Sequence, residues 1–582
     1  MFDDTLGEAL AVQLRQSPFL NLLSEQQVAA TLQQMARDGM TPLTPEIARE
    51  VCQRTSSRAT LGGTIASLGS RYVITLRALD CVNGSTLAEE QVQATSKEEV
   101  ITALGDAAAT FREKLGESLD MVQRYDANIE QATTASLDAL KAYSQGMLTR
   151  RTKGDFESVP FFRRALEHDP NFALAHARLG TVLSNLGEQD EAVKAVTRAY
   201  DLRDRVSERE RLYIEARYHT TVTRDQDKAL ESYRLLVATY PDDFAAHSNM
   251  GTLYRTRGML KEAIASLEHA VRLAPDQPLG HLNLGFAYLA DGRLGDARKE
   301  FDATLRVTES GTARTGLFTV ATLSGDQKLA DEQIAPTRGR REEVDMIATR
   351  AQAALYKGRA QEAAALADEV NRRVVALKRV DQAREGLLSF ALGMAMLGRD
   401  DLARREVARR RAEKTTTDGW TDEMLALAAL LGDATLAQQF LPRAIAHLRK
   451  VSRAEDADKA ERGMRALAAL AAGQNQQAYD LAVGLGDDAT QSNSVFLAAV
   501  AAYRLQRYAD AAQLFEKFLA FGSRLGLSAS HGAARVMLAR SYAGAGDKAR
   551  AKAAYEEAFR FWKEAESDLP LLVEARKDYA GL

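Results

Sequence analysis

The sequence predicts a mainly α fold, in which a tandem array of helical hairpins forms a solenoid behind a small, truncated α/β domain. Three observations lead to this prediction. Small and aromatic residues recur every 34 positions in the middle of the chain. Alternation of apolar and polar residues with a period of two is confined to roughly the first 120 residues. Proline is scarce, with 11 in 582 residues, and Ala and Leu crowd the second half, which favours helix.

The repeat is clearest in residues 244–290. Gly251 and Tyr254 recur 34 positions later as Gly285 and Tyr288. With Ala, Leu, Phe and Pro in their own slots, this period is the signature of the tetratricopeptide repeat, a pair of antiparallel helices. Another kind of helical hairpin array is the alternative. Because one pair cannot bury its own apolar face, we expect the pairs to stack into a superhelix with a concave groove.

Five regions are expected along the chain. They are a small α/β domain at 1–120, a linker at 121–135, a regular array of about five repeats at 136–310, degenerate repeat-like hairpins at 311–490, and further repeats with a capping helix at 491–582. In the degenerate region the pattern predicts helical pairs at 341–357 with 360–377, 380–397 with 400–414, 419–431 with 434–449, and 457–472 with 475–484. The turns within these pairs are expected at Gly358, Gly398, Gly432 and Gly473.

In the α/β domain we expect an amphipathic helix over residues 4–15 and a short buried strand over 19–23. Thr44 and Pro45 predict a further helix, because Pro suits the first helical position. Three alternating stretches follow, and Asn83 with Gly84 between the last two predicts a hairpin. These elements indicate a mixed sheet.

The expected sheet has no strand before its first helix, although a parallel-type strand at 19–23 needs a neighbour. Without that neighbour, one edge of the sheet would be left exposed. We therefore expect that the first strand is missing and that Met1 is not the natural beginning of the protein.

Net charge, apolar runs and cysteine content limit which partners and which compartment we expect. The net charge of −4 implies no general attraction to nucleic acid or to an anionic membrane, and we expect no nucleic-acid partner. The N-terminus lacks the basic and apolar regions of a signal peptide, and no run of 18 or more apolar residues predicts a membrane span. The two cysteines, Cys52 and Cys81, form no CxxC motif. We favour two small buried thiols over the alternative, a disulfide.

Catalytic motifs are absent from the sequence. A kinase needs a Gly-rich loop, a strand Lys, a catalytic-loop Asp and an Asp-Phe-Gly motif, and these do not occur in order. The sequence also has no GxxxxGK phosphate loop, no GxSxG elbow and no HExxH zinc helix. We therefore expect no enzymatic activity, no cofactor and no metal.

Three histidines, His176, His247 and His281, occupy the same slot of three repeats. A metal-binding ladder is one interpretation. Helices of neighbouring repeats are about 10 Å apart, however, which is too far for shared ligation at about 2 Å per bond. We favour packing in place of an aromatic side chain, with one ring nitrogen hydrogen-bonded.

A basic run in the degenerate region suggests a nucleic-acid patch or a solvated helix face. Two glutamates, Glu406 and Glu413, interrupt it, and no aromatic residues are interleaved, so we favour the solvated face. The run consists of Arg404, Arg405, Arg409, Arg410, Arg411 and Lys414.

The first helix of each repeat lines the concave face of such a solenoid, so its residues are the candidates for binding a partner. By repeat register, these are Thr181, Ser184, Asn185, Ser248, Asn249, Thr252, Arg255, Leu282, Asn283, Phe286 and Leu289. Some tetratricopeptide domains hold a peptide carboxylate with Lys and Asn in these slots, but Lys is absent here. The set suits an extended or helical peptide with one or two apolar anchors. A groove that is solvated, or filled by the chain's own segment, is the alternative.

Two stretches carry a more specific resemblance. They are QSPFLNLLS at residues 16–24 and LRDRVSERERLYIEARY at residues 202–218. With the repeats, they make essentially the whole chain similar to the C-terminal region of acidobacterial serine/threonine protein kinases. In that family a kinase domain, a transmembrane helix, a domain similar to the N-terminal domain of TolB, and a repeat array follow one another. The TolB-like domain of the family opens with a strand, and related architectures carry a winged-helix DNA-binding domain instead of the kinase.

The resemblance implies a scaffold or sensor region of a bacterial signalling protein, which binds a peptide or protein partner in the groove. Two alternatives stay open: the effector region of a transcription regulator without its DNA-binding domain, and a fragment of a serine/threonine kinase without its catalytic domain. As it stands, the chain is expected in the cytoplasm. Behind a transmembrane helix it would face the periplasm.

Overall fold

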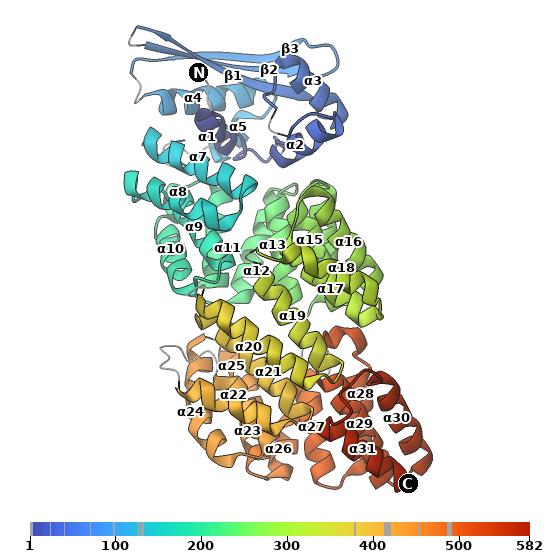
Figure 1. Ribbon diagram of the computed structural model, residues 1–582. Helices are drawn as coiled ribbons and strands as arrows, with labels where there is room; N and C mark the ends of the chain where they lie inside the picture. Colours follow the sequence, from blue (N-terminus) through green and yellow to red (C-terminus); the bar gives the residue numbers. More distant parts are fainter. Residues whose placement is uncertain are drawn as a thin grey trace. The chain divides into compact units, whose positions relative to one another are not determined.

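The computed structural model is mostly helical, with a small antiparallel sheet in its N-terminal part (Figure 1). It describes the whole chain except residues 1–3, 24, 40, 70, 97–98, 126–128, 130–132, 341, 377–379, 413–420, 452–453 and 486–491. The chain forms two compact units. The first contains residues 1–253 and 266–280, and the second contains residues 254–265 and 281–582. Within the described part of the chain, no helix has the length and apolar character that crossing a membrane requires.

The first unit begins with an α/β domain. Its elements are α1 (Asp4–Leu14), α2 (Glu25–Gln34), α3 (Pro45–Arg54), β1 (Ala59–Leu68), β2 (Arg71–Asp80), β3 (Thr86–Ala94), α4 (Val100–Lys114) and α5 (Leu119–Tyr125). The strands form an antiparallel sheet in the order β1-β2-β3. Helix α4 packs against β2 and β3 (Figure 1). Ile74 and Leu76 of β2 share a buried core with Leu104 of α4.

Two expectations for this domain are wrong. The sheet is antiparallel rather than mixed. Residues 19–23 do not form a strand, because the Ser17 hydroxyl accepts hydrogen bonds from the backbone amides of Phe19 and Leu20 and so bends the chain. Phe19 is 52% exposed. A strand needs partners for its backbone groups, and none of the described strands pairs with this segment.

Two local predictions are confirmed. Thr44 caps α3, and its hydroxyl accepts a hydrogen bond from the Ile47 amide at 3.4 Å. In the turn between β2 and β3, the Asp80 carboxylate accepts hydrogen bonds from the amides of Val82 and Asn83. Gly84 completes this turn with a φ of 74°, a conformation that favours glycine.

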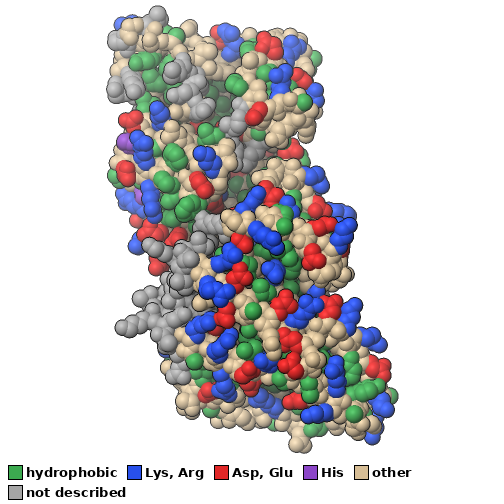
Figure 2. Space-filling view, in the orientation of Figure 1, with side chains coloured by type: hydrophobic (Ala, Val, Ile, Leu, Met, Phe, Trp, Pro, Cys, Tyr) green, Lys and Arg blue, Asp and Glu red, His purple; other side chains and the backbone are tan. Residues whose placement is uncertain are grey.

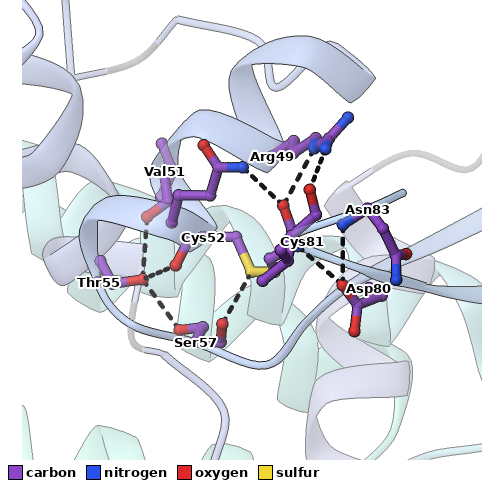
Figure 3. The surroundings of a disulfide bond; sticks show 10 residues. Arg49, Val51, Cys52, Thr55, Ser57, Asp80, Cys81 and Asn83 are labelled. Atoms are coloured by element: carbon purple, nitrogen blue, oxygen red, sulfur yellow. Dashed lines mark hydrogen bonds between the residues drawn. A yellow bond between two sulfur atoms is a disulfide. The ribbon is translucent and has the colours of Figure 1, made fainter. Parts of the chain in front are cut away.

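Cys52, near the end of α3, and Cys81, directly after β2, form a disulfide (Figure 3). The expectation of two free thiols is therefore wrong, although both residues are buried as expected. Their α-carbons lie 5.9 Å apart, a separation typical of bridged cysteines. The two residues are 29 positions apart, so their pairing depends on how α3 packs on the sheet rather than on sequence spacing.

After the α/β domain, the first unit continues as helical pairs. They are α7 (Leu137–Thr152) with α8 (Asp155–His168), α9 (Ala173–Asn185) with α10 (Gln189–Asp201), and α11 (Glu208–Thr221) with α12 (Gln226–Thr239). Small residues set the close crossing of α7 with α8 and of α9 with α10. A β-carbon added at Gly180 would lie 2.5 Å from Val196, and one added at Gly146 would lie 2.9 Å from Phe162.

Helix α1 shares one buried core with the sheet domain and with the first repeats. Leu10 and Leu14 of α1 belong to the same cluster as Tyr143 of α7 and Phe162 of α8. In the segment where a linker is expected, Ile129 is buried against Gly105 of α4. The α/β domain and the first helical pairs are thus continuous in packing.

Helices α13 (Phe244–Thr256), α14 (Leu260–Leu273) and α15 (Pro278–Ala290) each have residues in both units. The second unit continues with α16 (Leu294–Val307), α17 (Gly311–Ser324), α18 (Gln327–Ile334), α19 (Glu343–Tyr356), α20 (Ala360–Ala376), α21 (Val380–Met396), α22 (Asp400–Ala412), α23 (Thr421–Leu431), α24 (Ala434–Val451), α25 (Ala454–Ala471), α26 (Asn475–Ala482), α27 (Ser492–Arg504), α28 (Tyr508–Leu519), α29 (Ser530–Gly544), α30 (Lys548–Phe561) and α31 (Pro570–Ala580).

The predicted helical pairs between residues 341 and 484 are confirmed as α19 to α26. The glycines predicted at their turns adopt positive φ angles, which explains why glycine stands there. These angles are 74° at Gly358, 80° at Gly398, 64° at Gly432 and 72° at Gly473.

The second unit closes on itself along what we call the C-terminal seam, where residues 356–359 meet residues 562–569. Buried Trp562 donates a hydrogen bond from Nε1 to the Tyr356 carbonyl at 3.3 Å. Glu564 accepts a hydrogen bond from Arg359 at 2.7 Å. A β-carbon added at Gly358 would lie only 2.8 Å from Ala565. The seam therefore combines apolar packing with charge pairing.

Candidate partner-binding groove

First helices of successive pairs contact one another, as α9 contacts α11 in the first unit and α21 contacts α23 in the second. Their shared face is the one on which a solenoid of this kind offers a binding surface. The candidate residues fall into two groups. Thr181, Ser184, Asn185, Ser248, Asn249 and Thr252 lie in the first unit, and Arg255, Leu282, Asn283, Phe286 and Leu289 lie in the second.

On α9, the polar candidates take part in packing between repeats. The Thr181 hydroxyl lies 3.0 Å from the Tyr213 hydroxyl and also donates to a carbonyl of its own helix. The Asn185 amide donates a hydrogen bond to the Asp155 carboxylate at 2.7 Å. Ser184 is half-buried. These hydrogen bonds satisfy groups that a peptide would otherwise use.

On α13, the candidates of the first unit are largely covered. Ser248 is 2% exposed, so its side chain offers almost no surface to a partner. Thr252 is half-buried and donates a hydrogen bond to the Ser248 carbonyl at 3.0 Å. Asn249 is half-buried as well. This group therefore presents little free hydrogen-bonding capacity.

Arg255, at the C-terminal end of α13, differs from these residues. Its side chain is half-buried, and its guanidinium makes no hydrogen bond or ion pair with any residue that the structure describes. Burial lowers the pKa of Arg255, and no carboxylate opposes this effect. A desolvated arginine without an acceptor is costly, because arginine is almost always paired when it is buried.

On α15, the candidates form a partly exposed apolar stripe. Leu282, Phe286 and Leu289 follow the i, i+4, i+7 spacing of one helix face, and each is half-buried. The Phe286 ring packs edge-on against Phe301, with ring centroids 5.0 Å apart. Asn283 beside them is also half-buried. Phe301 thus fixes the position of Phe286 while part of the Phe286 ring stays accessible.

A partly buried polar cluster in the first unit was not predicted from the sequence. The Arg178 guanidinium lies over the Tyr213 ring, 5.1 Å from its centroid, and Arg209 pairs with Asp243. Burial acts to raise the pKa of Tyr213, but the positive charges of Arg178 and Arg217 outweigh it and lower the pKa. Several of these side chains belong to the stretch at 202–218, whose sequence gives no sign of these contacts.

The segment after α1 reaches the same region of the first unit. The Tyr240 hydroxyl donates a hydrogen bond to the Gln16 carbonyl at 3.2 Å, and Asn21 donates one to Asp242 at 3.3 Å. Burial, followed by the nearby Glu210 carboxylate, raises the pKa of Tyr240. Gln16 and Asn21, from one stretch that carries the family resemblance, thus contact Tyr240 and Asp242, and Arg209 from the other stretch pairs with the adjacent Asp243.

The three slot histidines each have one ring nitrogen hydrogen-bonded close by, as predicted. The contacts are His176 Nε2 to the Pro170 carbonyl at 3.0 Å, His247 Nε2 to the Pro241 carbonyl at 2.9 Å, and His281 Nδ1 to the Glu300 carboxylate at 2.6 Å. The first two contacts tie the start of a first helix to the turn before it. The histidines thus have structural roles within their own repeats.

The described part of the basic run is paired with carboxylates. Arg405 and Arg409 both reach Asp368, at 3.4 and 2.8 Å, and Arg404 lies 3.6 Å from Asp433. The side chains of Arg410 and Arg411, and residue Lys414, lie outside the described residues. On the face shown in Figure 2, acidic and basic side chains are interspersed. The described arginines therefore support a solvated, ion-paired helix face.

From α19 onward, the chain fills the inner face of the second unit itself. One continuous apolar cluster joins Leu355 of α19, Leu388 of α21, Met424 of α23 and Val536 of α29 with Trp562. Leu355, Leu388, Met424 and Val536 come from first helices, which would line an open groove, whereas Trp562 directly follows α30, a second helix. The sequence shows their apolar character, but it does not show that helices so distant along the chain meet.

Comparisons with known proteins agree with the repeat assignment. Family models match three parts of the chain, one described as TPR repeat at residues 251–292 and two as tetratricopeptide repeat at residues 161–194 and 533–561. No curated protein matches the chain.

Several solved structures are similar to parts of this chain. PilW, a type IV pilus biogenesis factor, is 18% identical over 36% of this chain and 98% of its own, with a TM-score of 0.28. A tetratricopeptide repeat protein from Parabacteroides merdae is 14% identical over 58% and 99%, with a TM-score of 0.25. YrrB, a TPR protein with an unusual peptide-binding site, is 20% identical over 30% and 90%, with a TM-score of 0.20.

The family matches fall on helical pairs that the structure contains at α8–α10, α13–α15 and α29–α30. Their small residues stand where paired helices cross, as at Gly180 and Gly285. The chain therefore contains a region of tetratricopeptide repeats.

Proposed function

We propose that this chain is a non-catalytic protein-interaction module that binds a peptide or protein partner on the inner face of its repeats. Repeats of this family generally serve protein contacts rather than catalysis, because stacked helical pairs offer an extended binding surface. The setting that we propose is a bacterial signalling protein, with this chain as the scaffold or sensor region associated with a serine/threonine kinase.

The proposal rests on one observation, the absence of a hydrogen-bond acceptor for Arg255 among the described residues. Its half-buried guanidinium has no acceptor among the described residues. Repeat register places it on the same inner face as Leu282 and Phe286 of the next repeat. All three residues belong to the second unit. A positive charge beside a partly exposed apolar stripe suits a partner that offers a carboxylate and an apolar side chain.

The partner chemistry follows from these groups. A carboxylate of the partner would form a charge-assisted hydrogen bond with Arg255 and remove the cost of its burial. An apolar side chain of the partner would cover the exposed part of Phe286, as anchors do at the centre of an interface. The polar candidates on α9 would contribute less, since their hydrogen bonds are already made.

The test is the affinity of the full chain for a partner recovered with it from cell lysate. The double variant Arg255→Ala with Phe286→Ala should weaken binding at least about ten-fold, which corresponds to about 1.4 kcal/mol. The matched control is Arg306→Ala with Val307→Ala, which removes the same kinds of group from the exposed side of α16. Equal affinities of the double variant and the wild type would refute the groove assignment.

A further inference from the structure

The Cys52–Cys81 disulfide joins helix α3 to the hairpin turn of the α/β domain, two segments that share little apolar packing. Figure 3 shows the bridge, which links the last turn of α3 to the residue after β2. It closes a loop that contains β1 and β2. The chain contains no other cysteine. The bridge therefore has a single possible pairing, and its formation in this chain requires no choice between partners.

Helix α3 depends on this bridge more than on apolar packing. Of its ten residues, Val51 and Cys52 are the buried ones. The remaining attachment to the hairpin turn is polar. Arg49 donates from Nε to the Cys81 carbonyl at 3.0 Å, and Gln53 donates to the same carbonyl at 2.7 Å (Figure 3). These hydrogen bonds are partly exposed, so each contributes little on its own.

The burial of both sulfurs excludes a role in thiol exchange on the surface. Cys52 is 3% exposed and Cys81 is 2% exposed. An exchanging disulfide must be reached by an attacking thiolate, whereas a structural disulfide is shielded from one. The geometry therefore points to a permanent cross-link that is made during folding.

We propose that this cross-link is made in an oxidising compartment, and that the protein works there rather than in a reducing cytosol. Structural disulfides persist in secreted and periplasmic proteins and are rare where thiols are kept reduced. In forming the bond, the two thiols lose two protons and two electrons, and a disulfide donor takes these up to become two thiols. This inference does not rest on the groove or on any partner.

The first test uses the protein in its natural cells. Cells are quenched in acid, the protein is denatured, and free thiols are labelled with a maleimide of known mass. We expect no label before reduction and two labels after it, by intact mass. Two labels before reduction would overturn the proposal. No variant is needed, so a folding defect cannot obscure the result.

The second test addresses the role of the bridge in holding α3. Hydrogen exchange of the purified full chain is compared with that of the double variant Cys52→Ser with Cys81→Ser. We expect at least ten-fold faster exchange of the α3 amides in the variant, while α4 stays protected as a control for the fold. Unchanged exchange in α3 would refute the role of the bridge. Partner affinity of the Arg255 variant is measured separately, so failure of either idea leaves the other standing.

Discussion

His531 is a buried side chain through which pH should act on the stability of the second unit. It is 4% exposed and packs against the rings of Tyr356 and Phe561. Its Nε2 has no hydrogen-bond partner in the described structure. Burial, followed by the positive charge of Arg535, lowers the pKa of His531 to about 4. The folded protein therefore holds this imidazole neutral.

The stability of the second unit should depend on pH through His531. In the unfolded chain its pKa is about 6.5, so the unfolded state takes up the proton first as the pH falls. The contribution is complete above about pH 6.5 and is lost towards pH 4, by up to about 3 kcal/mol. Unfolding followed by Trp562 fluorescence, in a background with Trp420→Phe, measures this loss. In His531→Phe the loss should be smaller by that amount, and an unchanged pH profile would contradict the assignment.

Gly532 is the position in the second unit where an added methyl group should be most costly. A β-carbon there would lie 1.9 Å from the Trp562 ring. Gly532→Ala should therefore lower the free energy of unfolding by about 1 to 3 kcal/mol, because overpacking forces side chains and backbone to shift. The control is Gly295→Ala in α16, where nothing lies within 4 Å of the added carbon. Chemical denaturation of both variants checks this; equal stability would show that Trp562 can move freely.

For single side chains, the sequence predicts which residue types line the groove, but it does not predict whether their hydrogen-bonding groups already have partners. Repeat register assigned Thr181 and Arg255 to the same kind of position. In the structure, Thr181 is hydrogen-bonded to Tyr213, whereas Arg255 has no partner among the described residues. The difference depends on which neighbours the next repeat supplies. A pattern of spacing does not contain that information.

Helix α1 is the element whose apolar face connects the α/β domain with the first repeats. It is part of the core that contains α7 and α8. Leu14→Ala removes a side chain that is 2% exposed, and it should destabilise the first unit by about 2 to 4 kcal/mol. Because the core is shared, hydrogen exchange should accelerate in α7 as well as in α1. Leu235→Ala in α12, where the side chain is 53% exposed, is the control. Acceleration confined to α1 would show that the packing is not cooperative.

Helices were predictable because their signals are local. Period, caps and glycine turns predict α19 to α26, and Thr44 predicts the start of α3. The strand expected at 19–23 failed for the opposite reason. Its apolar residues fit a strand, but a strand exists only if another strand pairs with it. The disulfide was not predicted because it also depends on tertiary packing: Cys52 and Cys81 meet only when α3 packs on the hairpin.

For the molecule as a whole, acidic and basic residues are nearly balanced, and the net charge of −4 predicts no general attraction to nucleic acid. Interspersed charges on the visible face of Figure 2 agree with that balance. The number of regular repeats, about five, stays a prediction from their period. The C-terminal seam could not be predicted, because nothing in the sequence indicates that residues 356–359 pack against residues 562–569.

The seam also fixes how many hairpins can lie between α19 and α29. An open solenoid grows or shrinks by whole repeats, because each repeat contacts only its neighbours. Here, Trp562 must return to the Tyr356 carbonyl after a set number of intervening helices. Gain or loss of one hairpin between α19 and α29 would move Trp562 away from its site. Gene duplication can therefore lengthen the array outside this closed turn, but within it the repeat count is locked.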